Sequence, residues 1–206
     1  HDIEKFVHVS TDETYGSIGT GSFSELDLLN PSSPYSASKA ASDLIALSYR
    51  TTFDLPVVVT RSSNNYGPFQ HPEKLIPLFI TNLLDELSVP LYGTGKNIRD
   101  WIYVDDNCNA IETVLRLGKV GETYNIGADN EVTNLDVTKW LIELCEAKSD
   151  AITFVEDRLG HDLRYSVDCS KVRSLGWSPL MKLSEGLAET VNWYRDNEAW
   201  WRDKKS

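Results

Sequence analysis

The chain has 206 residues, of which 41% are hydrophobic, and it carries a formal net charge of −11 at pH 7. This acidic balance argues against a nucleic-acid partner, because no broad basic face is available to meet phosphates, and no apolar run approaches the roughly 18 residues of a membrane helix. The three cysteines, Cys108, Cys145 and Cys169, are widely spaced, which favours reduced thiols in a cytoplasmic protein over a disulfide framework or a metal site.

The first part of the chain alternates between strand and helix patterns. Two short apolar runs, FVHVS at 6–10 and VVVT at 57–60, predict buried strands. Between them, the helical spacing of apolar residues predicts a helix from Tyr35 to about Thr52, and a second helix is predicted at about 74–87. Uniformly apolar strands that alternate with helices indicate an α/β fold with a parallel sheet covered on both faces.

After Pro90 the predicted elements become shorter. We therefore predict one domain over 1–90 and a smaller α+β domain over 91–206, with some crossing over between them. The later elements are strands at 90–93, 99–104, 122–127 and 152–155, helices at 105–117, from Thr133 or Asn134 to about Glu146, and from Ser184 through Tyr194, and a frayed tail with Trp200 and Trp201.

Polar residues follow both strands of the first part. Residues 10–13 (STDE) end one strand and residues 62–65 (SSNN) end the other, and ligands of open parallel sheets sit at such ends. Tyr35 and Lys39 are four residues apart, so on a helix they share a face. A nearby ammonium lowers a tyrosine pKa, which would make Tyr35 a usable base. The adjacent carboxyls Asp12 and Glu13 are compatible with a solvated turn or with an acid and base pair.

The arrangement of Ser/Thr, Tyr and Lys resembles the site of the short-chain dehydrogenase/reductase superfamily. The stretches VSTDETYG, PYSASKAASD, VVVTRSSNNYGP, PEKLIPLFI, GTGKNIRDWIYVDD, ETYNIGADNE and RLGHDLRYSVDCSKV resemble the dTDP-glucose 4,6-dehydratase family. The resemblance covers nearly the whole chain and implies the C-terminal portion of a Rossmann-type doubly wound sheet. The Gly-rich dinucleotide loop of that family is absent, so we expect a fragment that lacks roughly 100 residues, about three βα units.

The reaction that the resemblance implies is a redox-neutral dehydration of dTDP-glucose with NAD as cofactor. Tyr35 would take the proton of the sugar 4-hydroxyl, which Thr11 would hydrogen-bond, while hydride goes to NAD. Glu13 would remove the C5 proton, and protonated Asp12 would donate to the departing 6-hydroxyl. Close carboxyls push their pKa values apart, so one can be neutral while the other is ionised. Lys39 would also hold the nicotinamide ribose.

The resemblance implies further contacts on the cofactor and substrate sides. Arg99 and Arg158 match arginines that grip the diphosphate, to which a guanidinium can donate two hydrogen bonds. Asn134, at a helix start where the dipole favours anions, would donate a hydrogen bond to the diphosphate. His161 fits the deoxyribose of the nucleotide, which lacks a 2′-hydroxyl. The remaining implied contacts are Ser10 and Asn65 on the cofactor side and Asn64, Lys74 and Tyr92 on the substrate side.

Rival hypotheses remain within and outside this superfamily. One is another nucleotide-sugar enzyme: a GDP-mannose 4,6-dehydratase, a UDP-glucuronate decarboxylase or a 4-epimerase, although an epimerase needs no acid and base pair after the strand. Another is a non-catalytic sugar-nucleotide-binding fragment, which the missing dinucleotide loop supports. We also expect a homodimer through the helix that begins at Tyr35 and the helix near 74–87, and neither a nucleic-acid nor a membrane partner.

Overall fold

The computed structural model describes residues 3–205, which fall into two compact units, each built from three segments of the chain. Unit 1 comprises the chain up to Asn65, Arg99–Glu131 and Gly160–Leu180, and unit 2 comprises Tyr66–Ile98, Val132–Leu159 and the chain from Met181 onward. The boundary expected near residue 90 lies inside a segment of unit 2, and the crossing over is extensive. Contacts, and not chain order, define the units, because distant segments supply strands to the same sheet.

The main sheet of unit 1 consists of three parallel strands in the order β1-β2-β6: β1 (Phe6–Thr11), β2 (Val57–Ser62) and β6 (Thr123–Ile126). Every residue of the central strand β2 is buried. Burial on both faces explains why its sequence is a continuous apolar run instead of an alternating one. The predicted parallel sheet is confirmed, and β2 continues two residues further than expected, into Arg61 and Ser62.

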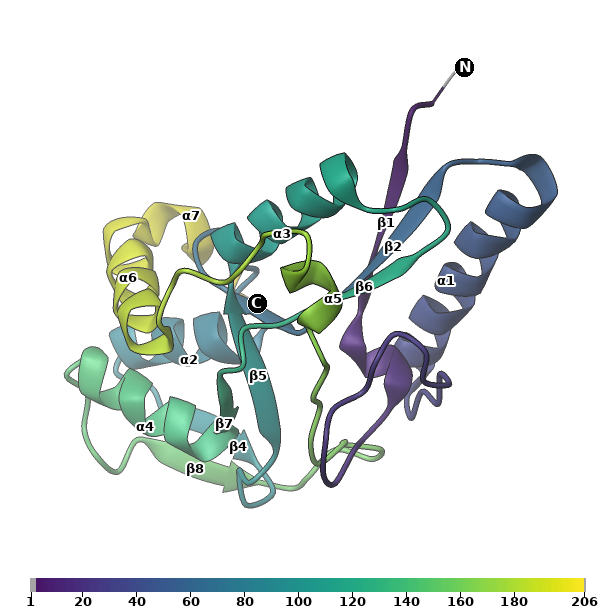
Figure 1. Ribbon diagram of the computed structural model, residues 1–206. Helices are drawn as coiled ribbons and strands as arrows, with labels where there is room; N and C mark the ends of the chain where they lie inside the picture. The colour runs from purple at the N-terminus through teal and green to yellow at the C-terminus, as the bar shows by residue number, and fades with distance from the viewer. Residues whose placement is uncertain (1–2, 206) are drawn as a thin grey trace. The chain divides into compact units, whose positions relative to one another are not determined.

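Helices cover both sides of this sheet. Helix α1 (Pro34–Phe53) packs against β1 and β2, and α3 (Val104–Leu117) packs against all three strands; Figure 1 shows the two helices on opposite sides. Ser33 is the N-cap of α1, with its hydroxyl accepting a hydrogen bond from the Ser36 amide at 3.1 Å, and Pro34 occupies the first helical position. Both features favour helix initiation at this point, so the predicted helix is confirmed.

Two short helical elements and a second sheet also belong to the region of the predicted site. A 3₁₀ turn, η1 (Asp12–Tyr15), follows β1 directly, and the four-residue helix α5 (Ser170–Arg173) packs against β6. A further three-stranded sheet has the order β3-β5-β7, with β3 (Asn64–Tyr66), β5 (Ile98–Tyr103) and β7 (Glu131–Thr133). The short strands β3 and β7 were not expected from the sequence, because three residues are too few to show a period.

Unit 2 contains the parallel pair β4-β8 and four helices: β4 (Val89–Tyr92), β8 (Ile152–Val155), α2 (Leu75–Leu84), α4 (Asn134–Leu144), α6 (Leu183–Asp196) and α7 (Glu198–Arg202). Helix α2 packs against α4, α6 and β4. Within residues 3–205, no helix combines the length and hydropathy needed to cross a bilayer.

The C-terminal tail is ordered, so the expectation of a frayed end is wrong. Trp201 on α7 is 1% exposed, and its indole N–H donates to the Tyr194 carbonyl at 2.7 Å. Lys205 donates to the Thr81 carbonyl at 3.0 Å and pairs with Asp85 at 2.6 Å. Burial of the Trp201 side chain against α6 and this half-buried lysine contact with α2 hold the tail in place, and neither can be deduced from local sequence.

Candidate active site

The two adjacent carboxyls lie on the four-residue turn η1, at the carboxyl end of β1. Thr11 is the N-cap of this turn, and its hydroxyl accepts from the Glu13 amide and donates to Asp12 Oδ1, each at 3.3 Å. The Thr14 hydroxyl donates back to the Thr11 carbonyl at 2.9 Å. Local hydrogen bonds therefore tie the predicted residues Thr11, Asp12 and Glu13 into one compact turn.

Asp12 is 3% exposed, which excludes the interpretation of its carboxyl as part of a solvated turn. Its Oδ2 is buried and makes no hydrogen bond with any residue between 3 and 205. Burial, reinforced by the negative charges of Glu13 and Asp100, raises the pKa of Asp12 to about 8, although Arg99 and the Thr11 hydroxyl act in the opposite direction. At neutral pH this carboxyl therefore carries a proton that it can donate.

Tyr35 and Lys39 occupy the first two turns of α1. Tyr35 is 56% exposed and stands near the helix N-terminus, where the dipole favours negative charge. Lys39 reaches back to β1, where its ammonium donates to the Val9 carbonyl at 2.8 Å. This hydrogen bond places the lysine beside the residue that precedes Ser10, so the predicted lysine and the end of β1 are brought together.

Buried polar atoms without hydrogen bonds gather at the ends of β1 and β2. Ser10 Oγ and Asn64 Oδ1 are buried and find no hydrogen-bond partner in the described part of the chain. Asn65 donates to the Ser63 carbonyl at 3.1 Å. Buried polar groups are almost always hydrogen-bonded, so Ser10 and Asn64 have the free capacity expected of residues that meet a bound ligand.

Arg99 lies near the carboxyl pair in unit 1. It is 6% exposed, and its guanidinium donates to the carbonyls of Asp162 at 2.9 Å and Leu163 at 3.5 Å. It also stacks 4.2 Å from the centre of the Tyr165 ring. Burial lowers the pKa of Arg99, while the negative charges of Asp12 and Glu13 oppose that shift. The predicted phosphate contact of Arg99 stays a prediction, and half-buried His161 lies in the same loop as Asp162.

Two residues of this region were missed by sequence reasoning. Asp100 is 4% exposed and accepts from the amides of Ala128 at 2.9 Å and Asn130 at 2.7 Å; burial raises its pKa, and its charge adds to the shift of Asp12. Tyr165 is 6% exposed and donates to Asp162 at 2.7 Å. The RDW motif contains Asp100, but charged residues are mostly exposed, so its burial could not be inferred.

In unit 2, the predicted residues Tyr92 and Arg158 lie together. Tyr92 ends β4 and is 42% exposed, and the Arg158 guanidinium lies 5.3 Å from the centre of its ring. Beyond Tyr92 the chain turns at Gly93 and Gly95, both with positive φ. The segment from Gly93 to Gly95 is therefore a turn and not a helix.

Asn134 lies beside the turn that follows Tyr92. It is the first residue of α4, after the N-cap Thr133, and its amide donates to the Asn97 carbonyl at 2.9 Å. Its side chain is 6% exposed, and Oδ1 makes no hydrogen bond with the described residues. The predicted position at a helix start is confirmed. Lys74, in contrast, is an exposed residue before α2 that pairs with Glu73 at 3.1 Å.

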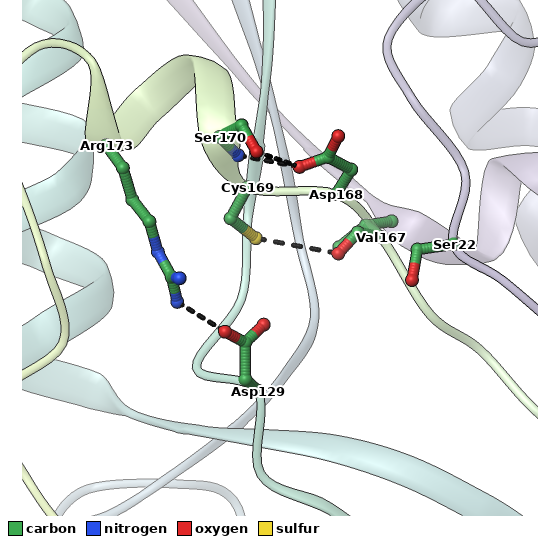
Figure 2. A pocket seen from close by; sticks show the side chains of 7 residues that line it. All are labelled: Ser22, Asp129, Val167, Asp168, Cys169, Ser170 and Arg173. Atoms are coloured by element: carbon green, nitrogen blue, oxygen red, sulfur yellow. Dashed lines mark hydrogen bonds and ion pairs between the residues drawn. The ribbon is translucent and has the colours of Figure 1, made fainter.

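A separate cavity of about 430 Å³ in unit 1 contains none of the predicted site residues (Figure 2). Its polar side chains are engaged with one another: Arg173 pairs with Asp129 at 2.6 Å, and Asp168 accepts from Ser170. Burial raises the pKa of the Cys169 thiol in its wall, which disfavours the reactive thiolate. The cavity lining is Ser22, Asp129, Val167, Asp168, Cys169, Ser170 and Arg173.

Comparison with known proteins finds relatives of this chain in one enzyme family. Residues 1–190 match the family described as GDP-mannose 4,6 dehydratase. The chain is 56% identical over 202 residues to a dTDP-glucose 4,6-dehydratase of Actinoplanes sp., with 98% of this chain and 63% of the relative covered.

Solved structures agree with the sequence matches. A dTDP-glucose 4,6-dehydratase of Streptomyces venezuelae with NAD and dTDP bound is 52% identical, with a TM-score of 0.97 over 98% of this chain and 63% of that one. The Bacillus anthracis enzyme in complex with NAD gives 52% identity and a TM-score of 0.93 over 98% and 65%. The resemblance inferred from the motifs is confirmed, and this chain spans about three fifths of the length of these relatives. It belongs to the GDP-mannose 4,6-dehydratase family, and within that family it is similar to the dTDP-glucose 4,6-dehydratases.

Proposed function

We propose that the protein represented by this chain dehydrates dTDP-glucose to dTDP-4-keto-6-deoxyglucose with NAD as cofactor. The observation that carries the proposal is the buried carboxyl of Asp12, whose raised pKa keeps it protonated beside Glu13 at the end of β1. An elimination across C5 and C6 needs a proton donor and a base on neighbouring positions. Similarity to enzymes solved with NAD and dTDP supports the same substrate and cofactor.

The proposed cofactor contacts of this chain are Ser10, Tyr35, Lys39 and Asn65. The buried Ser10 hydroxyl fits such a contact, because it lacks a hydrogen-bond partner in the described residues. NAD held by these residues would supply the acceptor for the C4 hydride and the donor of that hydride to C6, while Glu13 would give its proton back to C5. Lys39 orients the ribose.

The protein side chains then move protons at three atoms of the sugar. Tyr35 takes the proton of the 4-hydroxyl, which the Thr11 hydroxyl orients, as the C4 hydrogen leaves as hydride. The 4-ketone acidifies the C5 hydrogen, and the Glu13 carboxylate takes that proton. Asp12 gives its proton to the 6-hydroxyl, which departs as water while the C5–C6 double bond forms. Asp12 and Glu13 therefore divide the acid and base roles.

On the substrate side, we assign recognition of the nucleotide and its diphosphate to residues of both units. The guanidinium of Arg158 and the ring of Tyr92 form a stacked pair, and Asn134 opens the eleven-residue helix α4, whose N-terminal dipole favours an anion. Arg99, Asn64, Lys74 and His161 complete the proposed substrate contacts.

The test is incubation of the full-length protein with dTDP-glucose, followed by identification of the product. The expected product is the 4-keto-6-deoxy sugar nucleotide, formed without net consumption of NAD. GDP-mannose, UDP-glucuronate and UDP-glucose serve as parallel substrates that distinguish the related dehydratase, decarboxylase and epimerase reactions. Turnover of one of these in preference to dTDP-glucose would overturn the substrate assignment, and turnover of none would favour a binding role.

We also propose that the protein is a cytoplasmic homodimer that pairs through α1. This helix exposes a stripe of large apolar side chains: Leu44 at 62%, Ile45 at 59%, Tyr49 at 49% and Phe53 at 68%. Such a stripe exceeds what one sheet face covers and fits a self-complementary contact. The contribution expected from the helix near 74–87 stays a prediction, and the face formed by Ile76, Phe79, Ile80 and Leu83 of α2 is buried within unit 2.

Substitution in α1 tests the dimer. Leu44→Glu puts a charge into the stripe and should convert the full-length protein to a monomer by light scattering at micromolar concentration. Asn109→Glu, at an exposed position of α3, is the matched control and should leave the dimer intact. A wild-type monomer, or a Leu44→Glu variant that remains dimeric, would contradict pairing through α1.

A further inference from the structure

The acid and base pair and the tyrosine and lysine pair are on different elements of unit 1. Asp12 and Glu13 lie on η1, Tyr35 and Lys39 lie on α1, and an irregular segment rich in Gly, Ser and Pro separates the two elements in the chain. A surface loop of this kind does not fix two elements relative to one another. Catalytic groups nevertheless must be held to about 0.5 Å, so another contact has to set this geometry.

Arg61, in the sheet, contacts both η1 and α1. It lies on the central strand β2 and is 4% exposed. Its Nε donates to Asp43 Oδ2 on α1 at 2.8 Å, and its Nη1 donates to the Tyr15 hydroxyl on η1 at 2.7 Å. One rigid guanidinium therefore holds both elements at the same time, and its planar fork fixes the angle between the two bonds.

On the α1 side, the contact is made at a position in register with the catalytic residues. Asp43 is 0% exposed and lies one helical turn beyond Lys39 and two turns beyond Tyr35. Its Oδ1 lies 3.2 Å from His8 Nε2 on β1. An α-helix is stiff over two turns, with a rise of about 1.5 Å per residue, so fixing Asp43 fixes the depth and rotation of the first turns of α1.

On the η1 side, Tyr15 is the last residue of the turn that begins with Asp12, and it is 1% exposed. Burial raises the pKa of Tyr15, so its hydroxyl keeps the proton and donates to Asn125 Oδ1 on β6 at 2.9 Å. The ring stacks on Phe23 with centroids 5.1 Å apart. The turn is thus anchored through its last residue to β2 and β6, three residues from the carboxyl of Asp12.

A buried ion pair is a costly way to hold a helix on a sheet, because desolvation of both charges offsets most of their attraction and apolar residues would serve as well for stability. The ion pair instead contributes hydrogen bonds of fixed direction, which set the position of α1 on the sheet. We propose that Arg61, together with Asp43 and Tyr15, positions the Tyr35 and Lys39 helix relative to the Asp12 and Glu13 turn during the proposed dehydration. These three residues act through the catalytic groups and do not touch the sugar, and the inference rests on the proposed function.

The test uses Tyr15→Phe in the full-length protein, because this change keeps the ring and removes only the hydroxyl between Arg61 and Asn125. Loss of the two hydrogen bonds of this hydroxyl, one of them from a charged group, should allow η1 to shift and slow elimination relative to oxidation about tenfold. The measurement is single-turnover NADH absorbance combined with exchange of the sugar C5 hydrogen. Arg61→Lys, which keeps a charge for Asp43 but loses the second directed bond, should lower the same ratio.

Tyr124→Phe is the matched control. Tyr124 is 4% exposed, belongs to the same hydrophobic core as Tyr15, and its hydroxyl accepts from the Lys119 amide at 2.9 Å. It should lower the melting temperature as Tyr15→Phe does, with no change in the ratio of the two steps. If Tyr15→Phe also leaves that ratio at its wild-type value, Tyr15 contributes only stability and the proposal is overturned.

Amide hydrogen exchange without substrate separates this inference from the proposed function. The Gly16 amide donates to the Glu13 carbonyl at 3.2 Å and closes η1. Its exchange should accelerate about tenfold in Tyr15→Phe and stay unchanged in Tyr124→Phe. If the protein does not turn over dTDP-glucose, the proposed function fails, and the exchange rate still decides whether Tyr15 positions η1. Unchanged exchange at Gly16 in Tyr15→Phe would overturn the positioning role.

Discussion

Two turns at the ends of parallel strands carry predicted site residues, and their environments are opposite. In unit 1, η1 follows β1 and holds Asp12 at 3% exposure, with a pKa raised by burial. In unit 2, the turn after β4 follows Tyr92, which is 42% exposed and stacked by exposed Arg158. A group that must transfer a proton is desolvated so that its pKa approaches neutrality, whereas a group that recognises a ligand can stay in water until the ligand arrives.

The contrast predicts that substitutions near η1 change the rate of a chemical step, while substitutions near Tyr92 change affinity. The largest effect is expected for Tyr35→Phe in the full-length protein, because the ring remains and only the proposed base is lost. Turnover should fall by about 10⁴-fold, the upper end for general acid–base groups. No NADH should appear in a single turnover with dTDP-glucose. Rapid NADH formation in this variant would show that another group takes the 4-hydroxyl proton.

Asp12→Asn should reduce turnover less than Tyr35→Phe does, and it should block a later step of the reaction. The amide keeps the shape of the carboxyl but cannot donate a proton to the 6-hydroxyl, so elimination should slow by about 10²–10³-fold. Oxidation at C4 should survive, and NADH absorbance should rise and persist. Asp150→Asn, an exposed carboxyl outside the site, is the control. Normal turnover of Asp12→Asn would remove Asp12 from the mechanism.

The raised pKa of Asp12 also predicts a pH dependence of elimination. Since the donor is the protonated form, the rate of elimination should fall as pH rises through about 8. Oxidation depends on Tyr35 and should not follow the same curve. Single-turnover measurements of both steps from pH 6 to pH 9.5 would show whether their profiles separate, and identical profiles would contradict the assignment.

The same shift links pH to stability with a defined sign. The pKa of Asp12 rises from 3.8 in the unfolded chain to about 8 in the folded protein, so between these values the folded state binds more protons. Its contribution to the free energy of unfolding is therefore full below pH 3.8 and is lost as pH rises through 8, by at most about 1.4 kcal/mol per pH unit. Denaturant titrations of wild type and Asp12→Asn should differ in this slope, and equal slopes would show that Asp12 is not shifted.

How far the sequence could anticipate this structure depends on whether the signal was local. The strand VVVT is a continuous apolar run, and the helix that opens at Ser33-Pro34 carries a helical period and a cap, so both were predictable. Position at a strand end was enough to select Asp12 and Glu13 as candidates. The degree of burial was not predictable, because it depends on side chains that come from distant segments.

The buried charges illustrate that limit. Asp43 and Arg61 are eighteen residues apart and pair across a helix and a strand, at 2.8 Å and with exposures of 0% and 4%. From sequence, each is one charged residue among many, and the prior for a charged residue is exposure. The short strand β3 and the C-terminal helix α7 were missed for the same reason, since tertiary contacts stabilise them more than their local sequence does.

The smallest effect is expected at the exposed turn of unit 2, with Arg158→Lys. Lysine keeps the positive charge but loses the planar guanidinium that stacks on Tyr92 and can donate two parallel hydrogen bonds to a phosphate. The KM for dTDP-glucose should rise about tenfold, in the range expected for loss of a cation–π or bidentate contact, with kcat unchanged, because such a contact serves ground state and transition state alike. Arg116→Lys, on α3 and paired with Glu112 at 2.7 Å, makes the same chemical change at an exposed site and should alter neither constant. A fall in kcat without a change in KM would place Arg158 among the groups that act on the reacting atoms. The proposed division, in which the buried turn η1 carries the chemistry and the exposed turn after β4 binds the ligand, would then be wrong.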